Sequence, residues 1–221
     1  MTKIIKKAIV LGASGLVGRA LVQSLHELGQ CEQITVIVRH AISEFEHLEK
    51  VQQLVLEDFL LLNDEDVNGH THAFSCLGTT LKKAGSRQNF YDIDFEINAH
   101  FADLLQDKPI HYLLVSTLGA DSNSWFFYNQ VKGELEDYIQ SLNLAQVSIF
   151  RPSLLLGQRQ DTRVLEHFAQ KAYGIVEPWI KKRFRYKPIS AQQLAHTMVE
   201  VAQSQTEAFQ IYDNLSLQKN R

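Results

Sequence analysis

Tyr128 and Lys132 are the residues whose spacing most directly suggests chemistry. They are four positions apart in a segment with helical periodicity, so their side chains share one helix face about a turn apart. A phenol, with an ordinary pKa of about 10, exchanges its proton poorly at neutral pH, and a neighbouring ammonium favours the phenolate. The pair could therefore move a proton at the oxygen of a carbonyl or alcohol.

Two hydroxyl residues, Ser116 and Thr117, follow the apolar run at 112–115 that precedes this helix. We expect Ser116, with Thr117 as the alternative, to be the hydroxyl that fixes the substrate oxygen, and Tyr128 to be the proton carrier. We expect Lys132 both to favour the phenolate and to hold a nicotinamide ribose. The alternative is an amphipathic helix that carries one aromatic residue and one solvated lysine, because a Tyr-x-x-x-Lys spacing also arises by chance.

A glycine pattern at 12–18 lies between the apolar run at 8–11 and an amphipathic helix at 17–28. In such a loop the first glycine permits a tight turn, the second lets backbone approach a pyrophosphate, and the third brings helix against strand. The pattern predicts a dinucleotide site rather than a simple turn. The expected contacts in this loop are Gly12, Ser14, Gly15, Leu16, Val17 and Gly18.

The end of the second apolar run, at 34–38, indicates which dinucleotide is preferred. An NAD site normally carries an acid there for the ribose hydroxyls, and an NADP site carries a cation for the 2′-phosphate. Arg39 follows the run, and no carboxylate occurs before Glu44. We therefore expect NADP(H) to be favoured over NAD(H), with Arg39 as main ligand and Arg19 as a possible second. A solvated arginine at a strand end is the alternative.

Two further cofactor contacts are predicted from position alone. Asp58 follows the third run, where its carboxylate could accept from the adenine amine, although a turn-forming aspartate is equally compatible. Leu77, Gly78 and Thr79 follow the fourth run, where small residues would let the backbone lie along the cofactor.

Seven short apolar runs alternate with stretches of helical periodicity, which indicates an α/β fold with a doubly wound parallel sheet. Helices are expected at 17–28, 89–105 and 124–142, and Ser190 with Gln193 forms a capping-box start for a last helix. Residues 153–189 do not continue the alternation of strand and helix patterns. We interpret this segment as a substrate lid, or else as a surface excursion. One domain is expected over 1–221. The predicted strands are 8–11, 34–38, 54–56, 73–76, 112–115, 147–150 and 209–212.

Composition narrows the class of protein. The 22 Lys and Arg against 25 Asp and Glu, with a net charge of -3, argue against nucleic acid as a partner. The two cysteines form no disulfide framework, and His70 and His72 have no recognisable third ligand, so no metal is predicted. No apolar stretch approaches the ~20 residues that cross a bilayer. We expect a soluble cytoplasmic protein, monomeric or homodimeric, with an unknown small-molecule substrate.

Several segments together resemble the atypical short-chain dehydrogenase/reductases related to the Tat-interacting protein, over residues 6 to about 170. The resemblance implies a Rossmann-type domain, NADP(H) bound at the glycines and Arg39, and a catalytic set of Ser116, Tyr128 and Lys132. Thr117 stands where relatives often have a second serine. The segments are the glycine pattern at 12–18, Cys-Leu-Gly-Thr-Thr at 76–80 with Lys-Ala-Gly at 83–85, Ser116 with Gly-Ala-Asp at 119–121, Tyr-x-Gln-Val-Lys-Gly-Glu at 128–134 and Phe-Arg-Pro at 150–152.

Three functions are compatible with these residues. The first is an NADP(H)-dependent oxidoreductase acting on a carbonyl or an alcohol. The second is a regulatory protein that senses NADPH without turnover. The third is an epimerase or isomerase that retains its nucleotide, for which an acid near residue 38 would be expected; Val38 and Arg39 argue against it.

Overall fold

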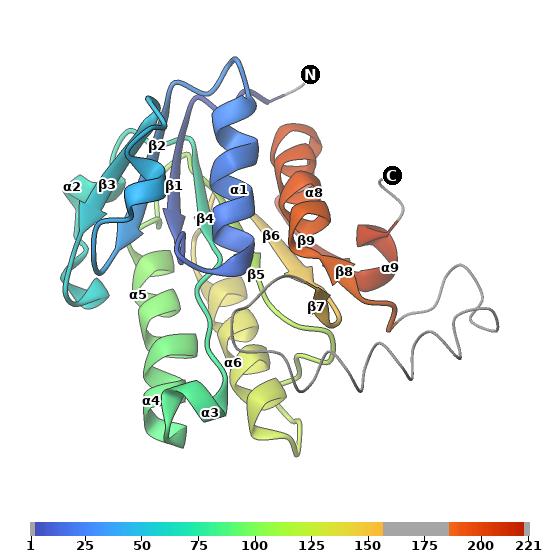
Figure 1. Ribbon diagram of the computed structural model, residues 1–221. Coiled ribbons are helices and arrows are strands. Elements are labelled where there is room, and N and C mark those ends of the chain that lie inside the picture. Colours follow the sequence, from blue (N-terminus) through green and yellow to red (C-terminus); the bar gives the residue numbers. More distant parts are fainter. Residues whose placement is uncertain (1–2, 157–185, 219–221) are drawn as a thin grey trace.

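A seven-stranded sheet forms the centre of the computed structural model, which describes residues 3–156 and 186–218. Every neighbouring pair of strands in this sheet is parallel. The order β3-β2-β1-β4-β5-β6-β9 confirms the predicted doubly wound α/β fold (Figure 1). The strands are β1 Lys7–Leu11, β2 Gln33–Val38, β3 Val51–Val55, β4 His72–Ser75, β5 His111–Val115, β6 Gln146–Arg151 and β9 Phe209–Asp213.

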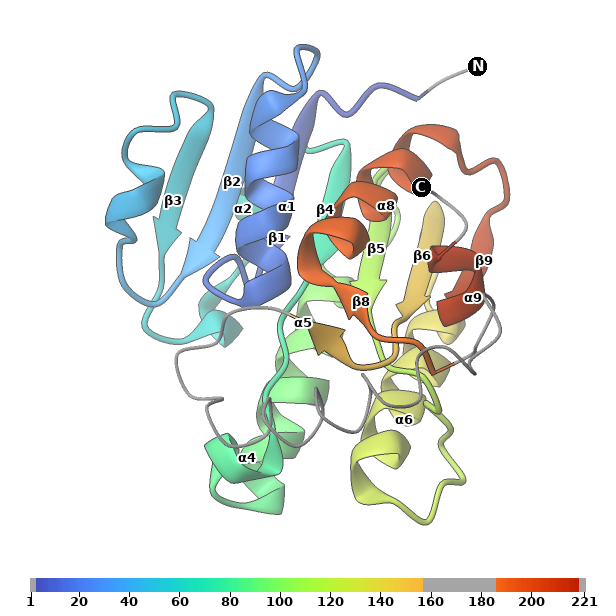
Figure 2. The same cartoon turned by 45° about the vertical axis from the view of Figure 1, so that its right-hand side comes forward.

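Helices cover both faces of the sheet (Figures 1 and 2). The helices α1 (Leu16–Glu27) and α8 (Ala191–Ser204) lie on one face, and α5 (Ile97–Asp103) and α6 (Phe127–Ser141) lie on the other. Strands buried on both faces become nearly continuous apolar runs, and this is why they were recognisable in the sequence. The shorter elements are η1 Ser43–Phe45, η2 Phe59–Leu61, α2 Asp64–Val67, α3 Leu81–Ala84, α4 Arg87–Tyr91, η3 Asp92–Glu96, α9 Asn214–Leu217, and the paired strands β7 Leu155–Leu156 and β8 Ile189–Ser190.

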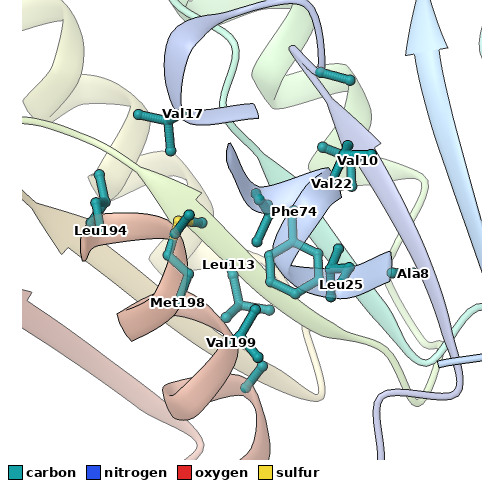
Figure 3. Close-up of a cluster of buried hydrophobic side chains, with 14 of the residues drawn as sticks. Ala8, Val10, Val17, Val22, Leu25, Phe74, Leu113, Leu194, Met198 and Val199 are labelled. Atoms are coloured by element: carbon teal, nitrogen blue, oxygen red, sulfur yellow. The ribbon is translucent and has the colours of Figure 1, made fainter. Parts of the chain in front are cut away.

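The core under α1 and α8 joins parts of the chain that are distant in sequence (Figure 3). Val10 of β1, Leu25 of α1, Phe74 of β4, Leu113 of β5 and Met198 of α8 are all 0% exposed. Truncating such a leucine or methionine to alanine typically costs about 2–5 kcal/mol. This packing holds α8 against α1 on one face of the sheet.

Three of the predicted elements differ from the structure by more than one residue at an end. The third strand was expected at 54–56 but spans Val51–Val55, because two consecutive polar residues, Gln52 and Gln53, interrupt the apolar run near its start. At this sheet edge Gln52 accepts a hydrogen bond from Gln33, and Gln53 accepts one from the Ile42 N–H. The helix expected at 89–105 is interrupted by η3, a π-helical turn.

The helix expected from residue 124 begins at Phe127. At α8 the predicted N-cap is confirmed, since the Ser190 hydroxyl accepts a hydrogen bond from the backbone N–H of Gln193 at 3.1 Å. The segment 153–189, predicted as a lid, lies outside the described residues over 157–185, and its role stays a prediction. None of the described helices is long and apolar enough to cross a bilayer.

The histidines His72 and His111 are buried beside each other at the amino ends of β4 and β5, with ring centroids 5.6 Å apart. The ring Nε2 of His72 lies 3.2 Å from the carbonyl of Ala202, and that of His111 lies 2.7 Å from the Ser148 hydroxyl. Burial lowers the pKa of His72 to about 4, and burial together with the nearby His72 lowers the pKa of His111 to about 3. Both rings are therefore neutral in the folded protein near pH 7.

Acid is expected to destabilise the fold through these two rings. Below the ordinary histidine pKa of about 6.5 the unfolded chain binds protons that the folded chain does not, so stability falls as pH falls, by about 3 kcal/mol per ring at pH 4. Urea unfolding between pH 7 and 4.5 measures this loss. His72→Gln, which removes one titrating group, is expected to flatten the dependence, whereas the exposed His196→Gln is expected to leave it unchanged. An equally steep loss in His72→Gln would contradict the assignment.

Candidate active site

The glycine loop lies at the point where the strand order reverses, between β1 and β4. Gly12 follows β1 with a positive φ of 79°, and a Cβ there would lie 2.5 Å from the backbone nitrogen of Leu77, which follows β4. A Cβ on Gly18 would lie 2.2 Å from the carbonyl oxygen of Gly12. Only glycine at these two positions lets the turn, the helix and the segment after β4 come this close. In an open α/β sheet this crevice at the strands' carboxyl ends is where ligands bind.

Gly15 differs from the other two glycines of the loop. A Cβ at this position would meet only the Gly12 carbonyl oxygen, at 3.2 Å. Gly15 precedes α1 and makes no side-chain cap, so the start of the helix offers its backbone N–H groups and positive dipole end without competition from a capping side chain. The fold itself therefore requires Gly12 and Gly18 more than it requires Gly15.

Arg39 is exposed just beyond β2, with its guanidinium carbon 6.0 Å from the centroid of the Phe59 ring. Arg19 is more constrained, because its guanidinium pairs with Glu44 and its Nε donates to the Ser14 carbonyl at 3.0 Å. A phosphate would have to compete with Glu44 for Arg19 but not for Arg39, so Arg39 is the better placed cation.

Asp58 caps the short helix η2 by accepting a hydrogen bond from the Leu60 N–H at 3.0 Å. The turn-forming role that the sequence left open is thus present. The expected contact between the Asp58 carboxylate and the adenine amine is not tested by this cap and stays a prediction.

The aromatic cluster at the start of α6 positions Tyr128. The Tyr128 ring packs 5.5 Å from the ring of Phe90, a fully buried residue of α4. Phe90 also lies 5.7 Å from Phe127, over whose ring the Arg87 guanidinium sits at 5.0 Å. The phenol is therefore held by ring packing, which leaves its hydroxyl for other contacts.

Lys132 is only 3% exposed, and its Nζ lies 2.7 Å from Oδ1 of Asp94, which is 0% exposed. The other carboxylate oxygen, Oδ2, accepts the backbone N–H of Thr79 at 2.8 Å. A Cβ on Gly78 would lie 3.2 Å from Asp94 Oδ1 and 3.5 Å from Lys132 Nζ. The proposed catalytic lysine and the loop predicted to line the cofactor thus meet at one carboxylate.

The charge on Lys132 is set by two opposing effects. Burial disfavours the ammonium, but the neighbouring Asp94, helped by Tyr128 and Glu136, outweighs it and raises the pKa of Lys132 above its ordinary value. The side chain is therefore a cation next to the loop after β4.

Asp94 was missed in the sequence, although a signal was present. Phe90, Asp94, Asn98 and Phe101 recur at helical spacing, and all four are buried. Two polar residues on an otherwise apolar helix face indicate a buried polar site.

Ser116 is buried at the end of β5, and its hydroxyl donates to a carboxylate oxygen of Glu136. Glu136 is itself buried and accepts two hydrogen bonds from Arg151 Nε, at 3.0 and 3.1 Å, and one from its Nη2. The Ser116 proton is therefore engaged in a buried ion-pair network, and Thr117 is the adjacent hydroxyl residue. Which of the two would hold a substrate oxygen stays a prediction.

No protein-family model matches the chain. Protein HTATIP2 of Rattus norvegicus is 36% identical over 173 residues, which cover 76% of this chain and 71% of that protein. Protein FMP52, mitochondrial, of Debaryomyces hansenii is 30% identical over 196 residues, which cover 88% of this chain and 87% of that protein.

Similar solved structures include a UDP-N-acetylglucosamine 4-epimerase from Methanobrevibacter ruminantium, with a TM-score of 0.70, 13% identity and coverage of 96% of this chain and 77% of that chain. Another is the human epimerase family protein SDR39U1 with NADPH, with a TM-score of 0.64 and 12% identity. The match covers 94% of this chain and 74% of that chain. At these identities the likeness shows the Rossmann-type fold.

The expected cytoplasmic location is contradicted by these relatives. Several FMP52 proteins, including those of Debaryomyces hansenii and Candida albicans, are named as mitochondrial proteins. The cytoplasmic prediction depended on cysteine usage, which indicates the redox conditions around a protein but does not identify its subcellular compartment.

The glycine loop provides a matched pair of variants. Gly18→Ala is expected to lower stability by several kcal/mol, on the order of a core truncation, because its Cβ would overlap the Gly12 carbonyl. Gly15→Ala is expected to cost about 1 kcal/mol or less of stability but to weaken dinucleotide binding at least tenfold, because the methyl group enters the space expected for the pyrophosphate. Thermal unfolding and calorimetric titration with NADPH distinguish the two. Undiminished binding in Gly15→Ala would show that the loop is only a turn.

Proposed function

Because the chain belongs to the atypical short-chain dehydrogenase/reductase family that includes HTATIP2 and FMP52, we propose that it is an NADP(H)-dependent oxidoreductase acting on a carbonyl or alcohol. The observation that carries the proposal is the meeting of Lys132 with the loop after β4, through Asp94, one helical turn from Tyr128. This arrangement supports proton transfer beside a nicotinamide.

In the proposed reduction, bound NADPH would supply a hydride to the carbonyl carbon. Tyr128 would donate its phenolic proton to the carbonyl oxygen, which leaves a phenolate that takes a proton back from solvent. Lys132 stays an ammonium because Asp94 raises its pKa, and its charge would stabilise the phenolate. A hydroxyl from Ser116 or Thr117 would hold the substrate oxygen. Alcohol oxidation would follow the same steps in reverse.

The preference for NADP(H) is supported by Arg39, the exposed cation at the end of β2, which pairs with no acidic side chain among the described residues. The neighbouring Arg19 is paired with Glu44. An NAD site would be expected to carry an acid in place of Arg39.

Apolar carbonyls are the first substrates to test. Trp125 and Phe126 are 101% and 75% exposed immediately before α6, three and two positions before Tyr128 in the sequence. Exposed aromatic side chains so near the proposed proton carrier would favour an apolar ligand. Aldehydes, ketones and quinones with aromatic or alkyl substituents therefore form the panel.

A sensor that binds NADPH without turnover is the second candidate, since it would use the same glycine loop and Arg39. The buried Lys132–Asp94 pair favours the enzyme, because nucleotide binding alone does not need a cation one helical turn from a phenol. An epimerase that retains its nucleotide is disfavoured by the absence of an acid at the end of β2.

Replacing Arg39 with Ala is expected to erase the coenzyme preference. The unmodified protein is expected to bind NADPH at least tenfold tighter than NADH, a difference of about 1.4 kcal/mol. Fluorescence titrations with both nucleotides at moderate salt measure the ratio. Arg19→Ala is the matched control, and we expect a smaller change because Glu44 already pairs with that guanidinium. Equal affinities in the unmodified protein would refute the assignment of NADP(H).

The proposed roles of Tyr128 and Lys132 are tested by removing the phenolic hydroxyl and the ammonium in turn. Tyr128→Phe keeps the ring that packs on Phe90, so NADPH affinity is expected to survive while turnover falls by about 10² to 10⁴. Lys132→Ala is expected to reduce both affinity and turnover. NADPH oxidation is followed by absorbance across the carbonyl panel, and binding is measured in parallel by fluorescence.

Tyr91→Phe is the matched control for this series, because Tyr91 stacks on Phe95 rather than on Phe90. A substrate whose turnover is unchanged in Tyr128→Phe would show that the proton carrier is wrong. Tight NADPH binding with no oxidation by any member of the panel would favour the sensor.

A further inference from the structure

The π-helical turn η3 is held in place by a buried amide. A π-turn disturbs the regular hydrogen bonding of a helix and is frequently found at functional sites. Asn98, which is 0% exposed, donates from Nδ2 to the carbonyls of Ile93 and Asp94, at 3.1 and 3.2 Å. Ser75, at the end of β4, donates its hydroxyl hydrogen to Oδ1 of Asn98. The turn is therefore fixed to the sheet by side chains.

The turn carries Asp94, whose carboxylate joins three elements. It contacts Lys132 on α6 and the Thr79 N–H in the segment after β4, and it belongs to η3. A carboxylate without solvent exposure is costly unless it is paired and hydrogen bonded. Here one oxygen has the ammonium and the other has the backbone donor, so the site is built around this charge.

We propose that Asp94 is a positioning residue, which fixes the place and the positive charge of Lys132 and ties both to the loop that would line the cofactor at Thr79. The inference rests on the proposed function, since it concerns the lysine of that same site. Asp94 touches neither substrate nor reacting atoms in this scheme and acts through Lys132.

The groups that face Lys132 show why its charge depends on Asp94. Tyr128 and Glu136 lie on the same helix, and Asp94 lies on η3. Glu136 is already bonded to Arg151 and Ser116. Asp94 is the acid in direct contact with the ammonium among the described residues. With an uncharged amide in its place, burial would dominate and lower the pKa of Lys132.

The test compares Asp94→Asn with Asp92→Asn, which removes a carboxylate on the same turn that bonds only Gln88 near the surface. NADPH binding is measured by fluorescence from pH 6 to 10. The unmodified protein and Asp92→Asn are expected to bind with the same pH dependence. Asp94→Asn is expected to lose a further tenfold or more by pH 9.5, as Lys132 loses its proton, with turnover falling over the same range. An unchanged profile in Asp94→Asn would overturn the proposal.

A second measurement needs no ligand. If Lys132 has a lowered pKa in folded Asp94→Asn, the unfolded chain binds more protons, so stability rises with pH up to about pH 10. The urea midpoint of Asp94→Asn is therefore expected to rise between pH 7.5 and 9.5 relative to that of Asp92→Asn. No relative rise would overturn the proposal even if no nucleotide bound. Absence of NADPH and NADH binding in the unmodified protein would instead refute the proposed function.

The double variant Asp94→Asn/Lys132→Met keeps the test decisive if Asp94→Asn folds poorly. Removing the second charge eliminates the buried ammonium that would otherwise lack a counterion. The double variant is expected to unfold at a higher urea concentration than Asp94→Asn alone. A double variant no more stable than the single one would show that Asp94 is not the counterion that compensates the Lys132 ammonium. This result would overturn the proposal.

Discussion

The contact between Lys132 and Asp94 is the interaction on which the arrangement of the site depends. Two opposite charges with almost no solvent exposure lie 2.7 Å apart at the carboxyl edge of a parallel sheet. Removing one partner of such a pair leaves an uncompensated buried charge, and this is far more costly than losing a surface salt bridge. The helix α6, the turn η3 and the loop after β4 are thereby held to one geometry, since η3 supplies the carboxylate and the other two each supply one of its partners.

The close approach of the backbone makes this arrangement possible. Gly12 lets the turn after β1 contact the segment after β4, and Gly78 leaves room beside Asp94 and Lys132. The glycines of the loop after β1 and the small residue after β4 therefore have a common steric role. A side chain at Gly12 would push the loop after β1 away from the segment after β4, and a side chain at Gly78 would crowd the contact between Asp94 and Lys132.

The sequence predicted the fold better than it predicted the site. Strands buried on both faces, such as β1 and β5, are short apolar runs that any parallel sheet requires, and the start of α8 followed from one capping serine. The edge strand β3 was misplaced because Gln52 and Gln53 interrupt its apolar run, and a strand at the sheet edge accommodates such polar residues. The π-turn could not be predicted from periodicity, since it depends on the Asn98 amide that bonds the carbonyls of the turn.

Two ion pairs on α6 show why the roles of Ser116 and Thr117 cannot be assigned from the sequence alone. Lys132 and Glu136 are one turn apart on the same helix, and each is paired with a charge from another element, Asp94 and Arg151. Ser116 donates to the second network and not to the first. A serine that already donates its proton to a carboxylate can hold a substrate oxygen only by giving up that bond, whereas the Thr117 hydroxyl donates to no carboxylate among the described residues. In the proposed enzyme, the energetic balance between the Ser116–Glu136 bond and a bond to the substrate would decide whether Ser116 or Thr117 holds the substrate oxygen.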